Sequence, residues 1–305
     1  MNVSIQTLPF EPTALNGLSE RLLRSHHENN YAGAVKRLNA IRAQLRGVAF
    51  ASTPGFQING LKREELIAAN SVVLHELYFE SLGGGTDQVM APAMALALAA
   101  SFDSVERWRD EFVAMGKALG GGSGWALLSF QPRDGTLVNQ WASDHAHVLA
   151  GAIPILALDM YEHAYQIDFG AAAARYVDVF MENIDWSKVH ERYQAAVIQS
   201  SEALGASPDE LGAALLLDLR RAEVFAQAEA LIEGAQWRDP VQIESWARQL
   251  PSKKDVVVYC AHGLEIGRLA AMRLRASGVH ARFLRGGYDE WSAAGRPLSR
   301  KKRRG

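Results

Sequence analysis

Residues 157–169 read ALDMYEHAYQIDF and continue the apolar run AGAIPILAL of residues 150–158. Asp159, Glu162 and His163 therefore gather at the point where a buried strand is expected to end. An acid leaving such a strand is costly unless something pairs with it or binds it. A histidine four residues after the first acid, beside a second acid, suggests a metal site. The same acids also suit the first turn of an ordinary helix, where the helix dipole favours them.

The composition of the whole chain is that of a globular protein. Its 305 residues are 48% hydrophobic and 22% charged, with a formal net charge of −2, so no basic excess favours nucleic acid or a membrane surface. The first residues, MNVSIQTLPFEPTALNG, do not resemble an export signal, and the longest apolar run, MAPAMALALAASF, is too short to span a bilayer. A single cysteine excludes an internal disulfide, and we expect a cytoplasmic protein.

The first two thirds of the chain predict an α-helical hairpin followed by an α+β region. Apolar residues at helical spacing predict helices over residues 14–48, 62–82 and 103–119, with a breaker, GGGTDQ, at residues 83–88. Strands are predicted at residues 124–131 and 136–143 around the turn PRDG, and helices at residues 171–182 and 183–197. We divide this region into residues 1–88 and 89–198.

The last third follows a different pattern, because short buried strands alternate with helical stretches. The strands ALLLDLR, DVVVYC and ARFLRGG predict a parallel sheet covered by helices, an α/β domain over residues 205–300. The small and polar residues 199–210 are interpreted as a linker. Residues 301–305 form a basic tail that we expect to be solvated.

Histidines on separate helices are the other candidates for a metal site. His26 and His27 lie within the first predicted helix, and His75 lies on the apolar face of the second. Taken alone, His26 or His27 suits a helix surface, and His75 suits a hydrogen-bonded core position. Three histidines and one carboxylate together suit a transition metal such as iron or manganese. Spacing in the sequence does not show whether these residues meet.

Six segments in order resemble the iron/manganese superoxide dismutases over residues 1–198: LPFEPTAL, HHENNYAGAVKRLN, HELYFESL, GGGSGWALLSF, LDMYEHAY and NIDWSKVHERY. The resemblance implies one iron or manganese ion per subunit, with His26, His75, Asp159 and His163 as ligands and a solvent molecule as the fifth. It implies that superoxide is converted to oxygen and hydrogen peroxide. It also implies a homodimer, or alternatively a tetramer, in which Glu162 reaches His163 of the partner subunit.

The surroundings of the metal are also implied by the resemblance. Trp125, Tyr161 and Trp186 are expected to wall the site and keep it dry. A glutamine or histidine in the family hydrogen-bonds the metal-bound solvent, and Ser71 is too short for that role. His145 in ASDHAHV fits the histidine variant, with His147 as the competitor.

The gate of the substrate channel departs from the family. Where the family has a tyrosine eight residues after the first ligand, this chain has Ala34. The histidine usual four residues after that ligand is Asn30, and its tyrosine partner from the other subunit is Gln166. We expect this altered gate to leave catalysis possible but slower at high pH.

Cys260 is the candidate nucleophile of the α/β domain, at the end of a strand and the start of a helix, where main-chain N–H groups stabilise a thiolate. A cysteine in that position is also commonly a small buried hydrophobe. LLLDLRRAEVF, VVYCAHGLEIGRLAA and FLRGGYDEWSAAGRPL resemble a single-domain rhodanese over residues 205–300. The resemblance implies a persulfide on Cys260, a sulfur donor such as thiosulfate, and a structural Asp218–Arg220 pair.

The rhodanese-like pattern also has departures. The usual entry motif is replaced by LIEGA at residues 231–235, and the loop carries Glu265, whose charge disfavours a thiolate; Arg268 partly compensates. The main hypothesis is a dismutase fused to a rhodanese-like module. The alternatives are a degenerate dismutase fold that serves as a metal-binding or interaction scaffold, a regulatory module, and a protein whose main activity is sulfur transfer at Cys260.

Overall fold

The computed structural model describes residues 2–83, 89–251 and 254–301. The chain forms two compact units, which are described separately below. The first contains Met1–Ser129 and Leu137–Glu191, and the second contains Phe130–Thr136 and Arg192–Gly305. None of the helices in the described residues is both long and apolar enough to cross a membrane.

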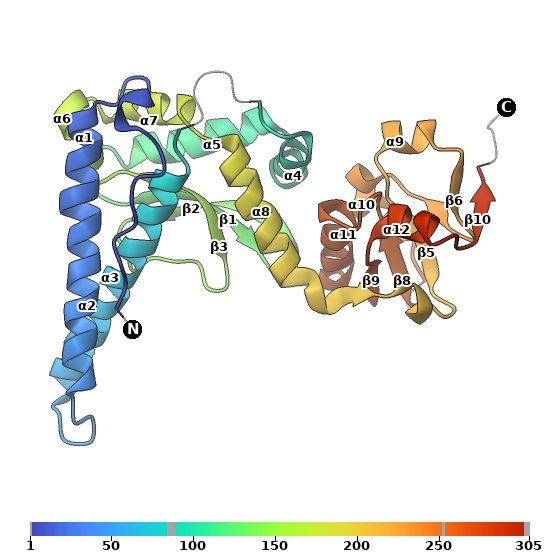
Figure 1. Ribbon diagram of the computed structural model, residues 1–305, viewed down its shortest axis with the longest axis horizontal. Helices are drawn as coiled ribbons and strands as arrows, with labels where there is room; N and C mark the ends of the chain where they lie inside the picture. The colour runs from blue at the N-terminus through green and yellow to red at the C-terminus, as the bar shows by residue number, and fades with distance from the viewer. Residues whose placement is uncertain (1, 84–88, 252–253, 302–305) are drawn as a thin grey trace. The chain divides into compact units, whose positions relative to one another are not determined.

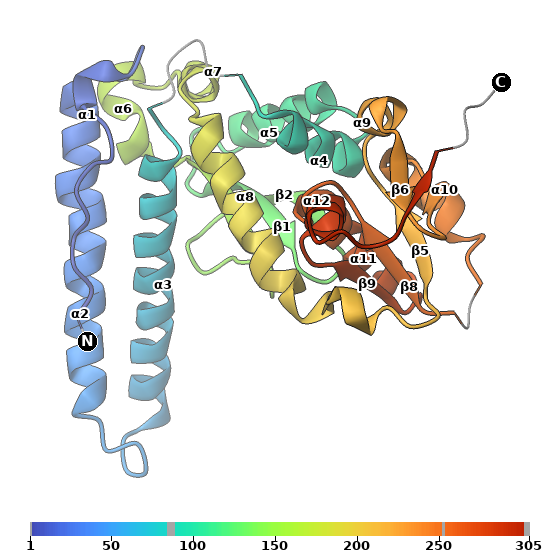
Figure 2. The same ribbon diagram turned by 45° about the vertical axis from the view of Figure 1, so that its right-hand side comes forward.

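The first unit begins with helices that form a long hairpin. The helices assigned to this unit are α1 (Glu20–Ser25), α2 (Ala32–Arg46), α3 (Gly55–Glu80), α4 (Pro92–Phe102), α5 (Val105–Ala118), α6 (Gln166–Phe169) and α7 (Ala173–Glu182). A π-helical segment, His26–Tyr31, joins α1 to α2. Helices α2 and α3 lie side by side over most of their length (Figure 1 and Figure 2). The hairpin therefore brings His26 and His75 onto neighbouring elements.

The predicted helices are present, but some of their ends differ. The helix predicted from residue 14 begins at Glu20, where Ser19 accepts a hydrogen bond from the N–H of Leu22 as its N-cap. The helix predicted at residues 62–82 begins earlier, at Gly55. Helix α4 was not predicted, although its proline at the first turn is a common helix start. Residues 84–88 of the predicted breaker lie outside the described residues.

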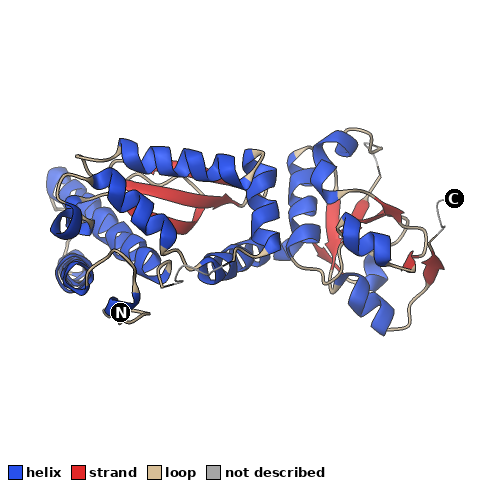
Figure 3. Ribbon diagram, turned by 90° about the horizontal axis from the view of Figure 1, so that it is seen from above, coloured by secondary structure: helices blue, strands red, loops and turns tan. Residues whose placement is uncertain are grey.

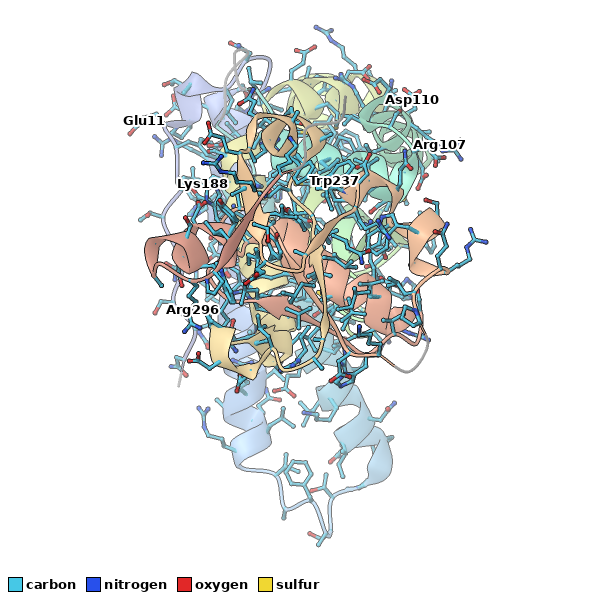
Figure 4. The ribbon with its side chains drawn as sticks, turned by 90° about the vertical axis from the view of Figure 1, so that its right-hand side faces the viewer. Glu11, Arg107, Asp110, Lys188, Trp237 and Arg296 are labelled. Carbon is cyan, nitrogen blue, oxygen red and sulfur yellow. The ribbon has the colours of Figure 1, made fainter. Side chains whose placement is uncertain are left out.

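The helices of the first unit surround a three-stranded antiparallel sheet with strand order β2-β1-β3 (Figure 3). Its strands are β1 (Trp125–Gln131), β2 (Thr136–Ala142) and β3 (Ile153–Asp159), close to the predicted positions. The last five residues of β3 are buried, and Asp159 ends the strand. Helix α5 covers the unit with Trp108 and Phe112, while Arg107 and Asp110 extend outward (Figure 4).

The second unit is the predicted α/β domain. Its main sheet has strand order β4-β9-β8-β5-β7, and every pair is parallel. The strands are β4 (Gly205–Ala206), β5 (Leu215–Asp218), β7 (Gln236–Trp237), β8 (Val256–Tyr259) and β9 (Ala281–Leu284). Alternate residues of β8 enter different core clusters: Val256 and Val258 join one, Val257 and Tyr259 the other. Both faces of β8 are thus covered, as expected for a parallel sheet.

The remaining elements of the second unit are short. They are the antiparallel pair β6 (Ala230–Ile232) and β10 (Leu298–Arg300), and the helices α9 (Ala222–Gln227), α10 (Ile243–Ala247), α11 (Glu265–Ala276) and α12 (Gly287–Ala293). Helix α8 (Trp186–Ser201) crosses the division between the units. Figure 1 shows α11 beside β8 and β9, which it covers.

The segment interpreted as a linker has regular structure. Helix α8 continues to Ser201, and Gly205 and Ala206 form β4, which pairs with Phe283 and Leu284 of β9. A strand of two residues is too short to produce a visible alternation in a sequence. Of the predicted basic tail, Lys301 donates hydrogen bonds to main-chain oxygens of α9. Residues 302–305 lie outside the described residues.

Gly124 is the glycine on which the first unit depends most. Its φ is +141°, and a Cβ there would lie 2.1 Å from the carbonyl oxygen of Ala142. We predict that Gly124→Ala destabilises the first unit by about 4 kcal/mol or more, which lowers its unfolding midpoint by about 8 °C or more. Gly151, with φ +76° and open space around it, is the matched control, and Gly151→Ala should cost about 1–2 kcal/mol. Equal decreases in the unfolding midpoints of Gly124→Ala and Gly151→Ala would contradict the predicted clash with Ala142.

Candidate metal centre and sulfur site

Four side chains from separate elements meet inside the first unit. His26 begins the π-helical segment, His75 lies in the last turns of α3, Asp159 ends β3, and His163 follows in a short 3-10 helix. One ligand atom from each lies within 4.8 Å of all the others, and no other such group occurs among the described residues. π-Helical turns within helices are frequent at functional sites.

The short distances in this cluster join histidine nitrogens to one carboxylate oxygen. Nε2 of His26 lies 3.1 Å, and Nε2 of His163 3.2 Å, from Oδ2 of Asp159. Nε2 of His75 lies 3.5 Å from the same oxygen and 3.5 Å from Nε2 of His163. Three imidazole nitrogens therefore converge on one side of a single carboxylate.

The protonation states suit a bound cation. Burial lowers the pKa of His26 and lowers that of His75 to about 3, so both rings are neutral at pH 7. Burial raises the pKa of Asp159, but the charge and hydrogen bonds of His163 and His26 outweigh it, and the carboxyl is ionised. Across the described residues, each ion-pair partner of Asp159 is a histidine rather than a lysine or arginine. The neutral rings of His26 and His75 bring no positive charge to this buried carboxylate.

Hydrogen bonds behind the cluster fix the orientation of the ligands. Nδ1 of His75 donates to the carbonyl oxygen of Ser71 over 2.6 Å, which leaves the lone pair of Nε2 directed at the cluster. The main-chain N–H of Tyr161 donates to Oδ1 of Asp159 over 2.8 Å. Nitrogen and oxygen donors of this kind fit iron or manganese. These four residues form a metal site.

Aromatic side chains line one side of the cluster. The indole N–H of Trp125 donates to Nδ1 of His145 over 2.9 Å, and the Trp125 ring meets the His75 ring edge-on at 5.3 Å. Tyr161 stacks on His145, with ring centroids 4.7 Å apart, and on His163 at 5.5 Å. His145 therefore lies in the same aromatic group as two of the ligands.

The other predicted neighbours lie elsewhere. His147 hydrogen-bonds Ser143 and stacks on Trp141 at the surface. The ring of Trp186 packs against Trp108 at 5.3 Å. His145 therefore contacts the ring of a ligand and His147 contacts Ser143 and Trp141, while the role of His145 at the metal stays a prediction.

The three altered gate positions have different surroundings. Asn30 is half-buried in the π-helical segment, Ala34 is buried in α2, and Gln166 is exposed at the start of α6. Among the described residues, these three side chains make no hydrogen bond with one another. Glu162, predicted to cross a subunit interface, is exposed.

Tyr31 is a neighbour of the site that the sequence analysis missed. Its hydroxyl donates to Glu76 over 2.8 Å and accepts from the main-chain N–H of Gln6 over 2.9 Å. Its ring lies 6.4 Å from that of His75. Burial raises the pKa of Tyr31 to about 12, so the phenol keeps its proton. The only signal in the sequence was its position one residue after Asn30.

A second candidate site surrounds Cys260, which is buried directly after β8. Main-chain N–H groups hydrogen-bond its sulfur, namely those of Gly267, Gly263, Leu264 and His262. Burial raises the pKa of the thiol, and these hydrogen bonds lower it by less, so the pKa is raised overall. The sequence analysis named Glu265 as the group that opposes a thiolate; burial is the largest cause in the structure, and Glu265 accepts a hydrogen bond from Gln194.

Arginines support the loop around Cys260. Arg268 donates to the carbonyl oxygen of Gly263 over 3.0 Å and to Glu202 over 3.0 Å. Burial lowers the pKa of Arg268, and the charge of the Cys260 thiolate raises it, so the two groups interact. Arg220 donates to the buried Asp218 over 3.0 Å and holds two segments together.

The sequence is similar to those of known proteins. Residues 90–192 match the family model "Iron/manganese superoxide dismutases, C-terminal domain". The "Superoxide dismutase [Fe]" of Cupriavidus metallidurans is 61% identical over 197 residues, which cover 65% of this chain and 99% of that protein. The chain belongs to the iron/manganese superoxide dismutase family.

More distant dismutases match over the same region. "Superoxide dismutase [Mn] 2" of Haloferax volcanii is 33% identical, and the match covers 65% of this chain and 98% of that protein. "Superoxide dismutase [Fe]" of Aquifex aeolicus is 32% identical, over 64% of this chain and 92% of that protein. Residues 201–294 match the family model "Rhodanese-like domain". The chain thus joins a dismutase to a rhodanese-like domain.

Replacing a ligand should remove the metal from this dismutase. We predict that His26→Ala retains less than about a tenth of the iron or manganese bound by the wild type, because the site loses one of three nitrogen donors. His27→Ala is the matched control, because His27 is the next residue but bonds the carbonyl oxygen of Gln6. Metal analysis should show that His26→Ala has lost the metal, and circular dichroism should show that it keeps its helix content. Equal metal content in the two variants would contradict the ligand set.

Proposed function

We propose that residues 1–198 convert superoxide to oxygen and hydrogen peroxide at the metal site of His26, His75, Asp159 and His163. The convergence of four ligand atoms within 4.8 Å, three of them from buried residues, supports this function most directly. These four side chains would hold a redox metal, which would supply the one-electron chemistry that superoxide dismutation needs. The chain's own residues bind the ion, orient its ligands and exclude bulk water.

His145 is proposed as the hydrogen-bond donor among the aromatic side chains beside this site. Because the indole N–H of Trp125 donates to Nδ1 of His145, that nitrogen carries no proton in the neutral ring. Burial lowers the pKa of His145, which keeps the ring neutral. The proton therefore lies on Nε2, where it can be donated to a solvent molecule or to superoxide.

Removal of this donor should slow turnover without removing the metal. We predict that His145→Ala lowers kcat about 10- to 100-fold, while metal content stays within about a tenth of the wild-type value. His147→Ala, which removes a surface histidine two residues away, should leave kcat unchanged. Stopped-flow decay of superoxide is the measurement. If His147→Ala is slower than His145→Ala, His147 rather than His145 is the hydrogen-bond donor.

The altered gate and the assembly are also part of the proposal. Ala34 has no hydroxyl to donate, so proton delivery depends on other groups, and we propose slower turnover at high pH.

The exposed position of Glu162 supports a homodimer in which it meets the partner's His163. The single buried cysteine supports the cytoplasm as its location. A scaffold without catalysis is the rival, and an inactive wild type with full metal content would favour it.

We propose sulfur transfer at Cys260 as a second function, carried by the rhodanese-like domain. The observation that favours it is the set of main-chain N–H groups around the sulfur, which suits a thiolate or persulfide. Thiosulfate is the proposed donor: the Cys260 thiolate attacks its outer sulfur, the sulfur–sulfur bond of thiosulfate breaks, and sulfite leaves with that bond's electron pair.

The two activities should be separable by mutation. We predict that Cys260→Ser acquires no persulfide from thiosulfate, as measured by intact-mass spectrometry, and keeps its dismutase activity. Glu265→Ser should raise the loading rate less than about tenfold, because burial rather than this carboxylate dominates the thiol pKa, and one pKa unit is about 1.4 kcal/mol. A wild type that acquires no persulfide would favour a regulatory role for the domain.

A further inference from the structure

A histidine–aspartate pair stands at the edge of the Cys260 loop. Nδ1 of His262 lies 2.6 Å from Oδ2 of Asp289, and both side chains are exposed, by 69% and 53%. His262 is part of the loop itself, because its main-chain N–H hydrogen-bonds the Cys260 sulfur. The pair therefore joins the sulfur-binding loop to α12.

The main chain holds this pair in place. The N–H of Asp289 donates to the carbonyl oxygen of Ala261 over 3.0 Å, and that of Tyr288 donates to the carbonyl oxygen of Cys260 over 2.9 Å. Gly287 lies so close to the loop that a Cβ would come within 2.5 Å of the Cys260 carbonyl oxygen. Asp289 thus reaches His262 from a fixed position, unlike the aspartate of an ordinary surface pair.

The hydrogen bond decides which nitrogen of His262 can accept a proton. An ionised carboxylate only accepts hydrogen bonds, so Nδ1 of His262 carries the proton. Nε2 then has a free lone pair, on a residue of the loop that surrounds the Cys260 sulfur. An aspartate that orients a histidine next to a nucleophile is the arrangement of a general base.

We propose that His262 is the general base for a thiol acceptor, so that the rhodanese-like domain transfers sulfur to thiols. This inference rests on the proposed sulfur transfer at Cys260. Thiol acceptors are mostly protonated at pH 7, since their ordinary pKa is about 8.5. They need a base before they can attack. Anionic acceptors that carry no proton can attack without a base.

The step balances without another reagent. Nε2 of His262 takes the proton of the acceptor thiol, and the resulting thiolate attacks the outer sulfur of the Cys260 persulfide. A new sulfur–sulfur bond forms to the acceptor, and the bond between the outer sulfur and Sγ of Cys260 breaks. Its electron pair stays on Sγ, where main-chain N–H groups stabilise the thiolate. His262 then returns the proton to the acceptor persulfide.

Three charged residues of α11 and α12 have partners in the structure. Asp289 of α12 is the direct partner of His262. Arg268 of α11 is bonded to Gly263 and Glu202, and Glu265 of the same helix is bonded to Gln194.

The chain contains a matched control pair. Nδ1 of His280 lies 2.8 Å from Oδ1 of Asp255, and these side chains are exposed by 61% and 56%. Asp255 directly precedes β8, whereas Cys260 directly follows it, so the control pair lies at the opposite end of that strand. His280→Ala removes the same kind of surface pair without touching the sulfur loop.

The experiment uses the full chain loaded with persulfide by thiosulfate and mixed with 2-mercaptoethanol or with sulfite. At about pH 7, His262→Ala should transfer sulfur to the thiol about 100-fold more slowly than the wild type. The difference should disappear at about pH 10, where the thiol ionises without help. Transfer to sulfite at about pH 8, where sulfite is mostly unprotonated, should be unchanged, and His280→Ala should resemble the wild type throughout.

Other results would overturn the proposal. Equal rates for His262→Ala and the wild type with the thiol would show that no base acts there. Equal slowing with thiol and sulfite would show that His262 only shapes the loop. If thiosulfate forms no persulfide on the wild type, the proposed donor reaction is wrong, but the role of His262 is still testable. Persulfide can then be installed on Cys260 with polysulfide, and its transfer to the thiol and to sulfite can be compared as before.

Discussion

The buried carboxylate of Asp159 is the constraint around which the first unit is organised. A charge at the end of a buried strand is tolerable only if positive charge faces it, and burial keeps two of the histidines around it, His26 and His75, neutral. A cation satisfies both requirements at once. The hairpin, the π-helical segment and β3 then have one shared task, which is to bring four ligand atoms to one point. The metal in return lowers the cost of burying the acid.

Local signals in the sequence indicated parts of this site, whereas the full ligand set was predicted from the family resemblance. Asp159 and His163 stand four residues apart after an apolar run, and His75 stands on an apolar helix face. Features that depend on distant contacts were not predictable. Asp289 lies 27 residues from His262, and Tyr31 meets Glu76 across the hairpin. Helix α4 was missed because its Ala-rich sequence lacks a polar face, so no helical alternation of apolar and polar residues is visible.

Two histidines in this chain show how one hydrogen bond assigns opposite roles to the same side chain. Nδ1 of His145 accepts a hydrogen bond from the indole N–H of Trp125, so the neutral ring carries its proton on Nε2. His262 meets a carboxylate at Nδ1 and so presents a lone pair at Nε2. Neither role is visible in the residue type alone. The partner at Nδ1 turns the first ring into a donor and the second into a base.

The short strand β4 has a consequence for the evolution of the joined chain. Gly205 and Ala206 complete the edge of the parallel sheet beside Phe283 and Leu284, and Glu202 just before them holds Arg268 and Arg285. The rhodanese-like domain thus uses residues that directly follow the last dismutase helix. If the domain were released by proteolysis after Ala206, β9 would lose β4, and the edge opposite β8 would become an open template for other strands. Selection against such aggregation would keep the two halves in one polypeptide, whether or not their reactions are coupled.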